Sequence, residues 1–242
     1  MTGSGPAALD ARLEPAARDW LATALEAVRR DPGTVRGYFP AVGRRLGRDP
    51  LDPAADPADV HAWTVDDAGR VELLRAAGGA DLERLYMHGD AAERRGVLRA
   101  LDVLPPTAEG RAVLLDALRT NDVRLVAAAA GGRCAAAELT DAELAQALLK
   151  CLFVGVPLTG IPALARVPAD AARMAADLVR ERVAAGRDVP ADAWLLLDPY
   201  PGVLERAGLP AELDSADPHR RAAASRFLGA RAASAVPTPR ED

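Results

Sequence analysis

The sequence predicts an all-α fold, in which antiparallel helical pairs stack in a HEAT-like, α-solenoid-like bundle. Three observations favour it: a composition rich in Ala and Leu with only 4% aromatic residues, apolar residues at helical spacing, and repeated helix-capping patterns. Ala favours helix, whereas β-branched and aromatic side chains favour strands. No segment alternates apolar and polar residues over a useful length, so we expect no β-sheet.

Capping patterns indicate where the helices begin. Asp90 with Glu93, and Thr140 with Glu143, have the spacing of a capping box. Further capping residues are expected at Asp66, Thr107 and Asn121. Helix starts near residues 90, 107, 122 and 141 have the spacing of stacked helical pairs, similar to repeats of about 34 to 45 residues.

The two ends of the chain have patterns of their own. A first helix is expected over residues 9–30, followed by an ordered connector over 49–59, where three prolines exclude regular helix. Later helices are expected over 168–186, from Pro190, and over 218–232. We expect residues 1–210 to form a single domain, and 211–242 to form a C-terminal helix and a tail that is disordered after Ser234.

Charge and composition exclude several classes of protein. The net charge of −5, from 30 basic and 35 acidic residues, gives no strong field for nucleic acid or an acidic membrane surface. Cys134 and Cys151 form no disulfide framework and are expected to be small buried side chains; with three scattered histidines they have no metal-ligand spacing. We see neither a signal peptide nor an apolar run of about 20 residues. We therefore expect a cytoplasmic protein with no cofactor, no metal, no nucleic-acid partner and no membrane span.

Two turns between helices hold candidate binding residues. His88 and Asp90 occupy one turn, where the imidazole is either a general base or a local turn residue. Arg119 and Asn121 occupy another, which either attracts an anion to a helix N-terminus or is simply capped by Asn121. If two helix crossings return the chain to the same edge, the two turns lie together.

Lys150, the single lysine, lies within an apolar run. A desolvated lysine can be a nucleophile or a base. Glu143, Gln146 and Lys150 also form one polar stripe at helical spacing, which predicts a lysine that simply faces solvent. The functional alternative for Lys150 is anion binding or a salt bridge. On the helix after Asp90, the stripe of Arg95, Arg99 and Asp102 is likewise expected to face water.

No segment has the spacing of a dinucleotide, phosphate-loop, zinc-protease or serine-hydrolase motif. Other segments are more informative: AVGRR (41–45), HGDAAERR (88–95), RTNDVR (119–124), LKCLFVGVPL (149–158) and ERVAAGR (181–187). Together they resemble the EboA family over about residues 15 to 200. The chain departs from that family at Leu178 and Arg180, where relatives often carry Tyr and His, and near Ala165, where an acidic residue is replaced.

The resemblance implies a place in a bacterial gene cluster that makes or moves a secondary metabolite. Neighbouring genes of such clusters resemble a UbiA-type prenyltransferase, a TatD-like hydrolase, a sugar-phosphate cyclase and a sugar-phosphate isomerase. The resemblance does not imply a biochemical role for the EboA component itself.

Two functional hypotheses follow. The first is a non-catalytic accessory or scaffold protein, whose partners are other proteins of the cluster or their polar or prenylated small-molecule product. It would bind through His88, Asp90, Arg119, Asn121 and Lys150. The alternative is a cofactor-free enzyme that acts on a cyclitol-like or prenylated intermediate with His88, Arg119 and Lys150.

Overall fold

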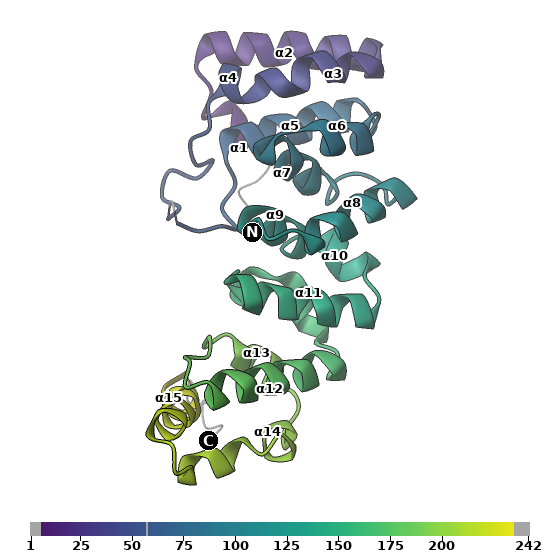
Figure 1. Ribbon diagram of the computed structural model, residues 1–242. Helices are drawn as coiled ribbons and strands as arrows, with labels where there is room; N and C mark the ends of the chain where they lie inside the picture. Colours follow the sequence, from purple (N-terminus) through teal and green to yellow (C-terminus); the bar gives the residue numbers. More distant parts are fainter. Residues whose placement is uncertain (1–5, 57, 235–242) are drawn as a thin grey trace, which may run out of the picture. The chain divides into compact units, whose positions relative to one another are not determined.

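The computed structural model describes residues 6–56 and 58–234, and its regular structure is helical (Figure 1). Within these ranges there is no β-strand; one isolated antiparallel bridge joins Pro50 and Thr64. The all-α prediction is confirmed. The tail after Ser234, which is expected to be disordered, lies outside the described residues. By its internal contacts the chain divides into two compact units, Met1–Glu138 and Leu139–Asp242, and the single domain expected over residues 1–210 stays a prediction.

The first unit contains ten α-helices within the described residues. They are α1 (Pro6–Asp10), α2 (Pro15–Arg30), α3 (Val35–Tyr38), α4 (Val42–Leu46), α5 (Val65–Ala76), α6 (Leu82–His88), α7 (Ala91–Ala100), α8 (Ala108–Arg119), α9 (Val123–Ala130) and α10 (Arg133–Glu138). The first helix expected over residues 9–30 is therefore interrupted after Asp10. Pro15 then begins α2, because proline at a first helical position loses no helical hydrogen bond.

Helices α5 to α9 pack in two layers (Figure 1). In one layer α5 packs on α7 and α7 packs on α9, while α6 packs on α8 in the other. Tyr86 Oη of α6 donates to Asp116 Oδ2 of α8 at 3.0 Å. At the far end of α7, Asp102 Oδ1 accepts from the backbone N–H of Cys134 at 2.9 Å, so the C-terminal ends of α7 and α9 meet. Within this unit the pairs α6–α7 and α8–α9 stack one upon the other.

The second unit packs around α11 and α12. Its α-helices are α11 (Asp141–Val154), α12 (Ala169–Ala184), α13 (Ala193–Leu197), α14 (Val203–Arg206) and α15 (Pro218–Ser234). Leu144 and Leu148 of α11 are buried, as its apolar periodicity indicates. The Trp194 ring stacks on Phe227 with centroids 4.5 Å apart, which anchors α15.

Two expected helix caps are one or two residues away from their observed positions. Thr64, not Asp66, is the N-cap of α5, in a capping box with Asp67. Asp122, not Asn121, is the N-cap of α9, because its carboxylate accepts from the N–H groups of Arg124 and Leu125. The capping boxes at Asp90 and Thr140 are confirmed.

Candidate binding site

The interior of the first unit contains four buried charged residues, Asp66, Asp67, Arg70 and Arg99. Asp66 and Arg70 face each other one turn apart on α5 and form an ion pair that is almost fully shielded from solvent. A Cβ atom added to Gly96 of α7 would lie 2.6 Å from Cδ of Arg70. Glycine at this position therefore gives the Arg70 side chain room between α5 and α7.

The prediction that Arg95, Arg99 and Asp102 face water is wrong. Arg95 Nε donates to Asp67 Oδ1 at 2.8 Å and Arg95 Nη2 donates to Thr64 Oγ1 at 2.9 Å, with only 12% of the Arg95 side chain exposed. Arg99 is buried and donates to the His61 carbonyl at 2.9 Å. Burial lowers the pKa of Arg99, although a guanidinium keeps its proton at neutral pH. Asp102 is half-buried and binds the Cys134 N–H.

The connector between α4 and α5 covers these arginines. Its two ends are joined by backbone hydrogen bonds, from Leu51 N–H to the Trp63 carbonyl at 2.8 Å and from Val65 N–H to the Asp49 carbonyl at 2.9 Å. The guanidinium carbon of Arg99 lies 5.1 Å from the centroid of the Trp63 ring. This cation–π contact and the carbonyl contacts of Arg99 hold the connector against α7.

A pocket of about 440 Å³ lies at the connector, and we call it the arginine pocket. Its charged lining consists of Arg48, Arg95 and Arg124 with Asp56 and Asp59. Its remaining wall includes Pro50, Val60, Trp63 and Thr64. The pocket therefore combines guanidinium groups from three separate segments with an aromatic ring.

None of the five predicted site residues lines the arginine pocket, but two of them lie near residues that do. Asp90 is an exposed N-cap whose Oδ2 lies 3.9 Å from Nη2 of Arg48, which lines the pocket. Asn121 is exposed in the turn before the helix that carries Arg124. Neither residue is among those that line the pocket.

The other three predicted residues lie on their helices as follows. His88 and Arg119 are the exposed last residues of α6 and α8, each within one turn of the Tyr86–Asp116 hydrogen bond. Lys150 is half-buried on α11 and belongs to the second unit. A shared role for all five residues stays a prediction.

Sequence reasoning missed the residues that line the arginine pocket. One weak signal was present: Asp66 and Arg70 are four residues apart in a helical segment, a spacing that places the two side chains on one face where they can pair. The position of Trp63, directly before that helix and after a proline-rich connector, is a second signal, because aromatic residues are scarce in this chain.

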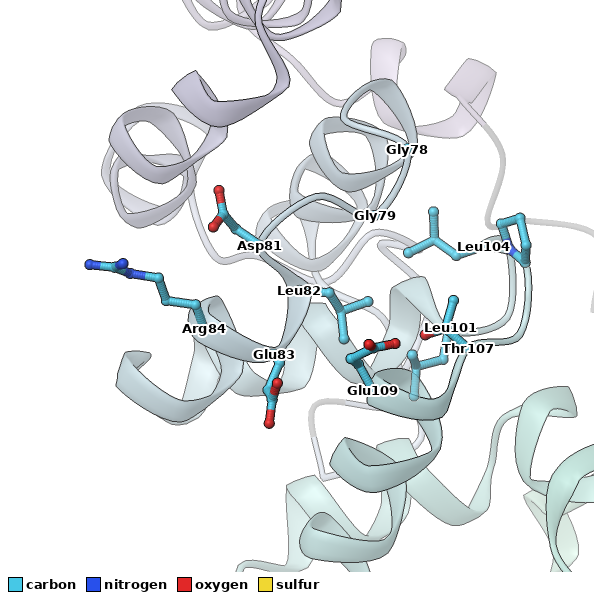
Figure 2. Close-up of a pocket in the computed structure, with 11 residues that line it drawn as sticks. Gly78, Gly79, Asp81, Leu82, Glu83, Arg84, Leu101, Leu104, Thr107 and Glu109 are labelled. Carbon is cyan, nitrogen blue, oxygen red and sulfur yellow. The ribbon is translucent and has the colours of Figure 1, made fainter.

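A second pocket, of about 420 Å³, lies between the α5–α6 turn and the start of α8. Figure 2 shows Leu82, Leu101 and Leu104 near one another, with the Glu109 carboxylate beside them. Asp81 and Arg84 point away from these leucines, and Asp81 pairs with Arg36 at 3.0 Å. Two charged side chains of this second pocket therefore point away from its apolar wall.

The cysteines are poorly suited to chemistry at neutral pH. Burial raises the pKa of Cys134 to about 11 and that of the buried Cys151 to about 12, so both remain thiols. Cys134 is half-buried, in contrast to the burial expected for it.

Among the described residues, no group of three or more His, Cys, Asp or Glu side chains could hold a metal ion. Nor is any helix in the described part of the chain long and apolar enough to cross a membrane.

Comparison with known proteins identifies a family. The family model of EboA, described as "Metabolite traffic protein EboA", matches residues 7–198 of the 242. Searches of curated proteins and of solved structures found no match. The matched range contains the whole arginine pocket and all five motifs that resemble the family, and the chain therefore belongs to the EboA family.

Proposed function

We propose that this protein is a non-catalytic accessory that binds a small metabolite in the arginine pocket and later releases it chemically unchanged. The name of its family, a metabolite traffic protein, supports a metabolite-related role. The observation that carries the proposal is the pocket itself, a volume of about 440 Å³ that is lined by three arginines and by Trp63. Small-molecule sites have volumes of roughly 300–1,000 Å³ and combine apolar walls with a few polar groups.

The lining of the pocket favours binding over bond-breaking. A general base should have a pKa near the working pH, and a guanidinium does not lose its proton in proteins. The described lining contains no histidine, cysteine or serine. The Thr64 hydroxyl donates to Asp66 Oδ1 and accepts from Arg95, so both of these interactions are structural.

The packing of the helices supports a scaffold of HEAT-like pairs. Successive layers of α5, α7 and α9 give a surface built from repeated helix ends, a geometry that repeat proteins use for binding. We place the protein in the bacterial cytoplasm, in secondary metabolism, with the other products of its gene cluster as partners. The alternative enzyme built on His88, Arg119 and Lys150 has less support, because the first two are exposed helix ends.

The proposal is tested by what the protein carries. The full chain is purified from its native cells and denatured, and the released small molecules are identified by mass spectrometry. We expect one compound to be retained by the wild type and largely lost from Trp63→Leu, whereas Trp20→Leu, which alters a half-buried tryptophan on α2, keeps it.

The released compound is then incubated with fresh protein. Recovery of the compound unchanged supports a carrier. A compound retained equally by both tryptophan variants, or one converted by the wild type into a product, would contradict the proposal.

A further inference from the structure

We infer that the ligand of the arginine pocket carries an anionic oxygen group, a phosphate or a carboxylate, which binds Arg95 together with Arg48 and Arg124. This inference rests on the proposed function and names the chemical class of its ligand. It also assigns Asp67 as the residue that positions Arg95.

Arg95 is held in one orientation before any ligand arrives. Its Nε binds Asp67 Oδ1 and its Nη2 binds Thr64 Oγ1. Among the described residues, its Nη1 makes no hydrogen bond, and the side chain lines the pocket. A guanidinium has five N–H donors in a rigid plane, so fixing two of its nitrogens still leaves the donors of Nη1 for a ligand. Such preorganisation lowers the entropic cost of binding.

The two acidic residues of the lining are occupied by the connector itself. Asp56 Oδ1 accepts from the Ala58 N–H at 2.8 Å, and Asp59 Oδ1 accepts from the His61 N–H at 2.9 Å. Both carboxylates thus stabilise turns of the backbone. Neither carboxylate forms an ion pair with Arg48, Arg95 or Arg124 among the described residues, although each keeps its negative charge.

The two other arginines come from exposed positions on either side of Arg95. Arg48 is 61% exposed and its nearest acidic partner, Asp90, lies at 3.9 Å. Arg124, in the first turn of α9, is exposed and its side chain has no ion pair within the described ranges. A carboxylate or phosphate fits such a set, because guanidinium groups bind oxyanions through paired hydrogen bonds.

Asp67 is fully buried and acts on the ligand only through Arg95. Its Oδ1 accepts from Arg95 Nε, while its Oδ2 accepts from the Thr64 N–H at 3.3 Å. Asp67→Asn keeps the size of the side chain and removes the charge that holds Arg95. We therefore expect Asp67→Asn to lower ligand affinity without contact between residue 67 and the ligand.

The test is isothermal titration calorimetry of the full chain with inorganic pyrophosphate, and separately with succinate, at low ionic strength. We expect saturable binding of at least one of the two anions, and the lower dissociation constant identifies the phosphate or the carboxylate class. Arg95→Gln should weaken that binding about tenfold or more, as expected for loss of a charged hydrogen bond. Arg124→Gln, at an exposed position, should weaken it by a smaller factor without loss of folding. Arg29→Gln, on the exposed end of α2, should leave it unchanged.

The role of Asp67 is tested in two backgrounds. Asp67→Asn should weaken pyrophosphate or succinate binding in the wild type, and should have no further effect in the Arg95→Gln protein. An equal loss in both backgrounds would assign Asp67 a purely structural role and overturn this part of the inference.

The inference as a whole fails if neither anion binds, or if Arg95→Gln and Arg124→Gln both bind as the wild type does. If the compound carried by the native protein proves to be uncharged and is still lost from Trp63→Leu, the proposed function stands and the anionic class is wrong.

Discussion

The two compact units of this protein differ in what they bury. In the first, Asp66, Asp67, Arg70 and Arg99 lie in the interior, whereas no charged residue of the described part of the second unit is buried to that extent. In the second unit the buried residues of α11 and α12 are mainly Leu, Val and Ala. A buried ion pair adds little stability over apolar residues of the same volume. We infer from the contrast that the buried Asp67 serves to orient Arg95 rather than to gain stability.

The largest effect on stability is expected where this ionic interior is broken on one side. Asp66→Ala should lower the free energy of unfolding by about 3–5 kcal/mol, because it leaves the buried Arg70 guanidinium without its partner. Urea denaturation measures the loss. Replacing both residues, as Asp66→Leu with Arg70→Met, should restore most of it; a double variant no more stable than Asp66→Ala would show that the ion pair itself stabilises the fold.

In the apolar interior of the second unit, a large-to-small substitution should lower stability only through the cavity that it leaves. Leu148 on α11 is fully buried, so Leu148→Ala should cost about 2–5 kcal/mol by the large-to-small rule. Phe153→Ala, at a residue that is 71% exposed on the same helix, should stay within about 0.5 kcal/mol in the same urea experiment. A loss below about 1 kcal/mol for Leu148→Ala would place this face of α11 at the surface.

A smaller effect is expected at the hydrogen bond between α6 and α8. Burial, and then the bond to Asp116, raise the pKa of Tyr86 above its ordinary value near 10. A raised pKa favours the protonated folded state, so the contribution of Tyr86 is complete below about pH 10 and declines as the pH rises further. Tyr86→Phe should cost about 1 kcal/mol at pH 8 and flatten this alkaline decline. Urea denaturation between pH 8 and 11 measures both; parallel profiles of the two proteins would refute the assignment.

The smallest effect should come from an exposed ion pair of the second unit. Arg173 and Asp170 pair on the surface of α12, with more than half of each side chain exposed. Arg173→Ala should change the free energy of unfolding by less than about 1 kcal/mol, and less still at high salt. A larger loss would mean that the second unit also depends on charge, and the contrast between the units would disappear.

Local patterns predicted most of the longer helices, but they missed short ones such as α6 and α10. The capping boxes at Asp90 and Thr140 lie within four residues of sequence, so their geometry depends on little else. The same holds for the family motifs, each of which is a short continuous run. Thr64 and Asp122 were missed as caps because a second polar residue close by, Asp66 or Asn121, offered an equally good pattern.

The burial of Arg95 and Arg99 could not be predicted in the same way. Helical periodicity separates a polar face of α7 from an apolar face, but it does not show what covers either one. Here the connector returns over the polar face and supplies the His61 carbonyl and the Trp63 ring as partners. The arginine pocket was missed for the same reason, since its guanidinium groups are far apart in sequence.

The most direct test uses a single ligand that can contact both the arginines and the Trp63 wall of the pocket. Geranyl diphosphate has an anionic head for the arginines and an apolar tail for the Trp63 wall, and it is titrated calorimetrically into the wild type, Arg95→Gln and Trp63→Leu. The account predicts saturable binding by the wild type and affinities about tenfold or more weaker in each variant, with the ligand recovered intact. No saturable binding, equal affinities in all three proteins, or release of inorganic diphosphate would contradict it.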